Sequence, residues 1–184
     1  MIQTELTPNP DTLKFLPGKK VSEIGPIEFL KKDKNIKIPL VNNIFAINGT
    51  SMVFLGADFI TVKKEKDLKW EDLKHGIISE INDFFAKGND SVIKKNLQKI
   101  DESSSNKKSN DIVNKINEIL DSKIRPAVAR DGGDIKFKSF EGGIVTVELK
   151  GSCSGCPSST MTLKQGVQNL LCHYIPEVKS VEAI

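Results

Sequence analysis

The chain has 184 residues with 27 basic and 24 acidic side chains, which gives a net charge of +3. A hydrophobic content of 38% and a charged content of 28% are ordinary for a globular protein of one domain or two small ones. The whole charge excess lies in residues 87–110, and only two basic residues are arginines. A nucleic-acid surface needs a basic face on a folded domain and is usually rich in arginine, so we expect no nucleic-acid partner.

A signal peptide and a membrane span are both disfavoured. The amino terminus has neither a basic start with an apolar run nor an arginine-rich pattern. Residues 38–57 lack charge over 20 residues, which approaches the length of a membrane helix. This stretch is interrupted by Pro39 and by Asn48-Gly49, however, so we expect no association with a membrane.

The first block, residues 1–88, has the pattern of a small α+β domain. Short apolar runs at 2–6 and 12–16 flank a turn rich in proline, and a short helix is expected after Pro26. Three strands are predicted at 44–47, 51–55 and 59–63, the first two joined by a hairpin turn at Asn48-Gly49. Apolar residues at helical spacing then predict a helix over 70–86.

Residues 89–110 are predicted to be a flexible linker. Their last ten residues, DESSSNKKSN, include no apolar side chain, and such a segment buries too little surface to offset the entropy of ordering.

The last block, residues 111–184, predicts the order α-β-β-α-β. An apolar stripe at 112–120 indicates a helix that Pro126 should kink or end. Alternating residues around Glu141-Gly142-Gly143 indicate a hairpin, and a second helix should begin near Pro157. Val178 and Val181 indicate a final strand. The fold class is therefore α+β, with two small mixed domains joined by a flexible linker.

The chemistry of the chain is predicted to lie in the loop GSCSGCP, residues 151–157, between the second strand of the hairpin and the helix after it. The C-x-x-C spacing lets Cys153 and Cys156 bind one metal centre. The free N–H groups at the start of the helix favour thiolate over thiol. No charged side chain occurs from residue 151 to residue 163, so an anionic centre would be stabilised by backbone donors.

Two cysteines are fewer than the four ligands that a structural zinc or an iron–sulfur cluster usually has. The third cysteine, Cys172, lies near the far end of the predicted helix and should be more than about 20 Å away. His173 fails for the same reason, and His75 belongs to the first block. The missing ligands are therefore expected from a second copy of the chain or from a small thiol.

Other readings of this loop remain open. A thiol–disulfide oxidoreductase also places C-x-x-C between a strand and a helix, and a zinc-bridged dimerisation module would use the same thiolates. Cys172 is expected to be a partly buried small side chain. Asp131 and Asp134 fit a turn better than acid–base catalysis, so no catalytic residue is predicted.

Two independent sets of motifs resemble one known family. GSCSGCPSSTMTLKQGVQNLLCHYIPEV, preceded by IRPAVARDGGD, is similar to the C-terminal domain of NifU-like (Nfu-type) iron–sulfur proteins. TPNPDTLKFLPGKKV and FAINGTSMVFLGADFITVKK are similar to the Nfu N-terminal domain. The resemblance covers nearly the whole chain except residues 89–110.

The resemblance implies an iron–sulfur cluster scaffold or carrier that is not an enzyme. Cys153 and Cys156 would bind a [4Fe–4S] cluster shared between two protomers. The cluster would come from an upstream assembly machinery and pass to apo iron–sulfur proteins. The resemblance assigns no role to Cys172 and no cluster ligand to the N-terminal domain. The expected location is a bacterial cytoplasm, or the mitochondrial matrix if the protein is eukaryotic.

Overall fold

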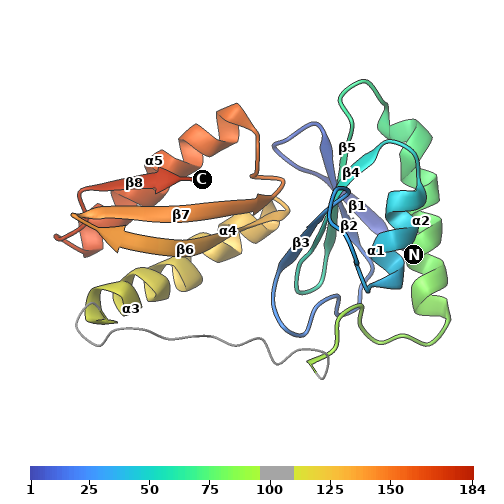
Figure 1. Cartoon of the computed structure of the whole chain (residues 1–184), viewed down its shortest axis with the longest axis horizontal. Helices are drawn as coiled ribbons and strands as arrows, with labels where there is room; N and C mark the ends of the chain where they lie inside the picture. The colour runs from blue at the N-terminus through green and yellow to red at the C-terminus, as the bar shows by residue number, and fades with distance from the viewer. Residues whose placement is uncertain (96–109) are drawn as a thin grey trace. The chain divides into compact units, whose positions relative to one another are not determined.

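The computed structural model of the chain describes residues 1–95 and 110–184, apart from the side chains of residues 110 and 157–159. The chain divides into two compact units, Met1–Gln98 and Lys99–Ile184 (Figure 1). Each unit combines helices with one sheet, which confirms the predicted fold class of two small mixed domains. No helix among the described residues is both long and apolar enough to cross a bilayer.

The first unit is an antiparallel sheet with two helices against one of its faces (Figure 1). The strands lie in the order β1-β2-β5-β4-β3, which places β1 and β3 at the two edges. The elements in chain order are β1 (Gln3–Leu6), β2 (Thr12–Leu16), β3 (Ile27–Leu30), α1 (Pro39–Ala46), β4 (Thr50–Leu55), β5 (Ile60–Lys64) and α2 (Trp70–Ala86).

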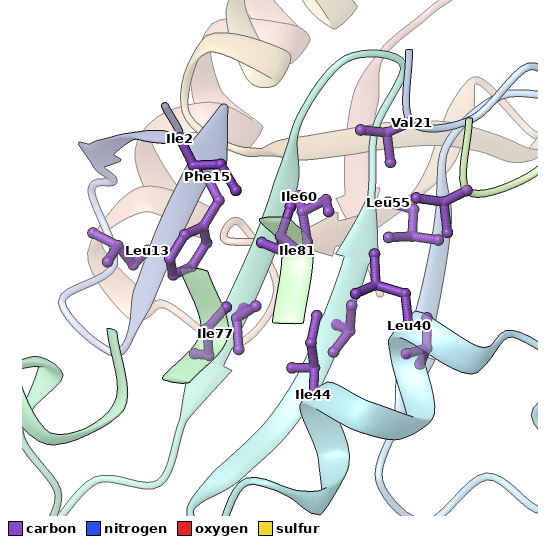
Figure 2. Packing of buried hydrophobic residues seen from close by; sticks show 14 of the residues in the cluster. Ile2, Leu13, Phe15, Val21, Leu40, Ile44, Leu55, Ile60, Ile77 and Ile81 are labelled. Carbon is purple, nitrogen blue, oxygen red and sulfur yellow. The ribbon is translucent and has the colours of Figure 1, made fainter. Parts of the chain in front are cut away.

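The core of this unit lies between the sheet and the two helices. Alternate strand residues such as Phe15 and Ile60 face Ile77 and Ile81 of α2, with Ile44 of α1 beside them (Figure 2). All five side chains are buried, with exposed fractions of 0%. Each fully buried side chain of this size contributes about 1.5–3 kcal/mol through the hydrophobic effect.

Two predictions for the first unit are wrong. Residues 44–47, predicted as a strand, form the end of α1 and the residue after it, and Asn48-Gly49 joins that helix to β4. Thr50 Oγ1 donates to the carbonyl of Ile44 at 2.9 Å and so satisfies a group at the helix end. The helix predicted after Pro26 is instead the edge strand β3, paired with β4. The runs at 2–6 and 12–16, the strands at 51–55 and 59–63 and the helix at 70–86 are confirmed.

Residues 89–95, the first part of the predicted linker, pack on the first unit. The N–H groups of Val92 and Ile93 both donate to the carbonyl of Val21, at 2.9 and 3.0 Å. Both side chains are buried in the core of the unit. The rest of the predicted linker up to residue 109 lies outside the described residues, so the domain boundaries at 88/89 and 110/111 stay predictions.

The described residues of the second unit form a three-stranded sheet, and the predicted order α-β-β-α-β is confirmed. Strands β6 and β7 form an antiparallel hairpin, and β8 pairs with β7 in parallel. The helices before the hairpin and the helix after it pack together with the sheet residues in one hydrophobic core. The elements are α3 (Asn110–Ile119), η2 (Leu120–Ile124), α4 (Arg125–Arg130), β6 (Gly133–Glu141), β7 (Ile144–Gly151), α5 (Pro157–Tyr174) and β8 (Ser180–Ala183).

Pro126 does not end the first helical segment of this unit, and the alternative expectation of a kink there stays a prediction. The chain passes from α3 through the π-helical turn η2 into α4, in which Pro126 occupies the first turn. The Arg125 N–H donates to the carbonyl of Leu120, five residues earlier. A wider π turn accommodates the missing proline donor and its ring, which would obstruct a regular α-helix.

Candidate metal centre

The two predicted ligands lie in a short loop between β7 and α5. Gly151 and Gly155 have φ angles of 70° and 73°, in the left-handed region that costs other residues about 1–2 kcal/mol. The N–H of Ser154 donates to the carbonyl of Gly151 at 3.2 Å, which closes a turn around Cys153. Glycines at these two positions therefore let the loop turn back before the helix begins.

The loop is anchored on both sides. Ser152 donates through its backbone N–H to the carbonyl of Gly132 at 3.2 Å and through its hydroxyl to the carbonyl of Asp131. Thr160, in the first turns of α5, donates through its hydroxyl to the carbonyl of Cys153 at 3.2 Å. Its N–H donates to the carbonyl of Cys156 at 2.9 Å, the first hydrogen bond of the helix. The loop conformation is thus fixed by the turn before β6 and by α5.

Both candidate ligands are buried in this conformation. Cys153 is 4% exposed and Cys156 is 6% exposed. A side-chain carbon at Gly133 would lie 2.8 Å from Cys153 Sγ and 2.6 Å from the carbonyl oxygen of Lys150. Since real side chains do not approach so closely, Cys153 occupies space that only a glycine at position 133 leaves open.

Burial decides the protonation of Cys153. It raises the pKa of this thiol from 9.0 to about 11, and the negative charges of Asp131 and Asp134 act in the same direction. The contact between Cys153 Sγ and the Ser152 hydroxyl opposes the rise and is too weak to cancel it. The thiolate that the helix start was predicted to favour is therefore not the resting form of Cys153; in this conformation it is a neutral thiol at neutral pH.

A third metal-binding side chain does not join the pair within the described part of the chain. No group of three or more His, Cys, Asp or Glu residues is arranged to hold a metal ion there. Cys172 is partly buried on α5, and at 1.5 Å per residue it lies about 24 Å along the helix from Cys156. His173 is the next residue of α5, so neither Cys172 nor His173 joins the predicted ligands; His75 lies on α2 of the first unit.

Asp134, interpreted from the sequence as part of a turn, is a buried residue of β6, next to Gly133. It is 3% exposed, and one of its carboxylate oxygens lies 3.3 Å from Nε of Arg125. The other oxygen has no hydrogen-bond partner among the described residues. Burial raises the pKa of this carboxyl, and the nearby guanidinium partly offsets the rise. Arg125 also donates to the carbonyl of Ile135 at 3.1 Å and so fixes the start of β6, next to Gly133.

Comparisons with known proteins agree with this architecture. The family model described as "NifU-like domain" matches residues 116–182, and the one described as "Scaffold protein Nfu/NifU N terminal" matches residues 2–88. The human protein "NFU1 iron-sulfur cluster scaffold homolog, mitochondrial" is 46% identical over 184 residues, which cover 100% of this chain and 71% of that protein. "NifU-like protein 4, mitochondrial" of Arabidopsis thaliana is 42% identical over 183 residues, with 98% of this chain and 65% of that protein covered.

The chain thus spans about two thirds of the length of these curated relatives. Among solved structures, the solution NMR structure of a NifU-like protein from Saccharomyces cerevisiae matches with a TM-score of 0.48 and 28% identity, over 52% of this chain and 85% of that one. Each of the two family models falls within one structural unit, in the order expected from the motifs. The chain belongs to the NifU/Nfu family, with an Nfu-type N-terminal domain followed by a NifU-like domain.

Proposed function

We propose that the chain is an iron–sulfur cluster scaffold or carrier whose cargo is a [4Fe–4S] cluster bound by Cys153 and Cys156 of two protomers. The observation that carries this proposal is the pair of thiols in one anchored loop, with no third ligand beside them in the described residues. The family relationship supports the same role, because the human relative is named as an iron–sulfur cluster scaffold.

The number of ligands supports sharing between two protomers. An iron–sulfur cluster of this type takes four thiolates, and each loop supplies two. A two-fold axis through the cluster would bring equivalent loops together. The loop and the first turn of α5 contain no charged side chain, so the N–H groups at the start of that helix would offset the negative charge of the cargo. A cluster that each protomer holds by only two ligands at an interface is suited to release.

The burial of the sulfurs bears on how cargo enters. Cys153 packs against Gly133 and belongs to the core of the second unit. Loading therefore requires the loop to turn its sulfurs outward and to lose the thiol protons. The free-energy cost of opening the loop is offset when thiolates bind iron. The closed loop protects the thiols of the unloaded chain from oxidation.

The oxidoreductase alternative is disfavoured by the same geometry. A catalytic dithiol needs a thiol whose pKa is lowered and whose sulfur is accessible. In Cys153 the pKa is raised to about 11 and the side chain is buried. A zinc ion that bridges two loops would use the same thiolates. Metal analysis of protein purified without air is therefore needed to distinguish a zinc-bridged dimer from a dimer that shares an iron–sulfur cluster.

The remaining parts of the proposal follow from a carrier role. The protein binds and passes on a cluster and catalyses no reaction of its own. Its partners are a second copy of the chain, an upstream assembly machinery and apo iron–sulfur proteins as recipients. The relatives named above are mitochondrial proteins, which favours the mitochondrial matrix if this protein is eukaryotic; a bacterial cytoplasm stays the alternative.

The test is anaerobic reconstitution with iron and sulfide. The expected product is a brown dimer with about four iron atoms and the Mössbauer spectrum of a [4Fe–4S] cluster. Cys153→Ser or Cys156→Ser should abolish binding, and Cys172→Ser, the matched control, should leave it unchanged. A colourless monomer would contradict the proposal, and loss of colour with Cys172→Ser would overturn the ligand assignment.

A further inference from the structure

The first unit contains a groove that the proposed cluster chemistry does not use. Its volume is about 440 Å³, and it lies between the edge strand β1 and the first turns of α2. The apolar part of its lining comes from Leu6, Leu13 and Trp70. At its polar rim are Glu71, Lys74 and His75, all on α2.

One wall of the groove is a strand with an open edge. In the described sheet, β1 pairs with β2 on one side and with no strand on the other. Leu6 is paired with Leu13 in the register of these strands, so the two side chains point to the same face. Leu13 is buried there, but Leu6 is 86% exposed. An apolar side chain left in solvent next to unpaired backbone groups is a template for another strand.

The edge strand β8 of the second unit, unlike β1, has a backbone N–H that is occupied by a side chain. The N–H of Val181 in β8 donates to Oε1 of Gln168 in α5, at 3.1 Å. A side chain that occupies an edge N–H in this way hinders the pairing of a further strand. Within the described residues, no side-chain hydrogen bond of this kind is made to the backbone of β1.

The groove is held open by fixed contacts. Trp70 donates from Nε1 to the carbonyl of Pro10 at 3.1 Å, and its ring lies 6.5 Å from that of Phe15 in an edge-to-face arrangement. Asp11, in the same loop as Pro10, forms an ion pair of 3.0 Å with Lys64 of β5. A rim fixed in this way loses little entropy when a ligand binds.

The charges of the rim define the occupant further. Lys74 and His75 form no ion pair within the described part of the chain, and neither does Glu71. Lys74 lies four residues after Trp70, about 6 Å along the helix. Alternate residues of an extended strand are about 6.8 Å apart on one face. An extended segment can therefore place an apolar side chain over Trp70 and a carboxylate near Lys74 when the two are separated by one residue.

We propose that β1 and this groove bind an extended segment of a partner protein that carries an apolar residue and an acidic residue two positions apart. The segment adds a strand to the open edge of β1, its apolar side chain packs on Leu6, Leu13 and Trp70, and its carboxylate pairs with Lys74. This is the strand-addition mode of peptide recognition. It does not depend on the proposed cluster chemistry, because every residue involved lies in the first unit.

The test uses Trp70, the only tryptophan of the chain, as a fluorescent probe in the full-length protein. An acetylated and amidated peptide GTLTDTG is titrated to about 1 mM, and the expected result is a saturable change in emission. Lys74→Glu should weaken binding about threefold and strengthen binding of the matched peptide GTLTKTG by a similar factor. Leu6→Asp should weaken binding at least tenfold, and Lys66→Glu, a charge reversal at an exposed site outside the groove, should have no effect.

Leu6 is exposed, so its substitution should leave the thermal unfolding of the first unit unchanged, which circular dichroism checks. The proposal is overturned if emission does not change, or if the change persists with both Leu6→Asp and Lys74→Glu. Sedimentation that shows the free chain associating through Leu6 would overturn it in favour of a second copy as occupant.

Discussion

Replacing Gly133 with alanine should destabilise the second unit through contacts that can be specified in advance. The new methyl group would lie 2.6 Å from the carbonyl oxygen of Lys150 and 2.8 Å from Cys153 Sγ. The first of these atoms is backbone in the β6–β7 pairing and cannot rotate away. Gly133 is not among the glycines with positive φ, so alanine can adopt its backbone conformation, and the penalty comes from the contacts alone.

The magnitude follows from two opposing effects. Overpacking of a tight site costs about 1–3 kcal/mol, and the lower entropy of alanine in the unfolded chain returns about 0.4–1 kcal/mol. The net loss is about 1–2 kcal/mol, which lowers the melting temperature of a unit of this size by roughly 5–15 °C. Gly166→Ala is the matched control. It lies in α5 with nothing within 4 Å of the added carbon, and alanine there should stabilise the helix by about 1 kcal/mol.

The assay separates the two units. Thermal unfolding of the second unit is followed by hydrogen exchange of its core amides, and Trp70 fluorescence follows the first unit, in which the only tryptophan lies. Gly133→Ala should lower the unfolding temperature seen by hydrogen exchange in the second unit and leave that seen by Trp70 fluorescence unchanged. Adding Cys153→Ala removes one of the two close contacts, so the double variant should lose less stability than the sum of the single variants. Unchanged exchange in Gly133→Ala would refute the close packing of Cys153 against β6.

Three further results are expected. With Cys156→Ser and Cys172→Ser in place, Cys153 of the folded protein should react with iodoacetamide at pH 8 about tenfold more slowly than Cys153 of the protein unfolded in urea. A pKa of about 11 in place of 9.0 lowers the thiolate fraction about a hundredfold, and the higher nucleophilicity of that thiolate recovers about tenfold. A pH–rate profile of the folded protein that levels off near pH 9 would contradict this. Burial raises the pKa of Asp134, so its carboxylate opposes folding above that pKa and its protonation at lower pH removes the penalty. In urea titrations, the difference in unfolding free energy between wild type and Asp134→Asn should therefore change in favour of wild type from pH 7 to pH 4. A difference that stays constant with pH would argue against a buried charge. Trp70→Phe removes the indole hydrogen bond to the turn after β1 and should lower the unfolding free energy of the first unit by about 1 kcal/mol, measured by circular dichroism in urea. An unchanged urea midpoint would mean that this hydrogen bond does not anchor the turn.

The sequence predicted those elements whose apolar pattern is long or lies beside a clear turn. Helix α2 and the hairpin of β6 and β7 are of this kind. The failures are short apolar runs. Residues 44–47 are apolar and fit a strand or a helix equally well, and the spacing of buried Leu40, Val41 and Ile44 after Pro39 is the signal that favours the helix. Residues 27–30 form a strand because β4, more than 20 residues later, supplies the partner, which no local pattern reveals.

The candidate site was found from the spacing of Cys153 and Cys156, but its surroundings could not be found in that way. The sequence interpretation treated residues 131–134 as a turn. The structure shows that Gly133 packs against the sulfur of Cys153 and that Asp134, the next residue of β6, is buried. The free N–H groups at the start of the helix predict a site that favours thiolate, whereas the burial of Cys153 favours the thiol.

A single irregularity in β6 decides which residue faces the sulfur. Near the hairpin turn, Phe140 pairs with Val145, whereas the pairing further along is shifted by one residue at a bulge between Phe137 and Ser139. Because of this shift, Gly133 pairs with Gly151; without it, Gly133 would be opposite residue 152. A one-residue change in register turns each side chain to the other face of the sheet. The space that Cys153 occupies therefore depends on a bulge that has no clear signature in the sequence. Deletion of Lys138, about five residues from Gly133, should disturb the site more than substitutions within the exposed part of the hairpin do.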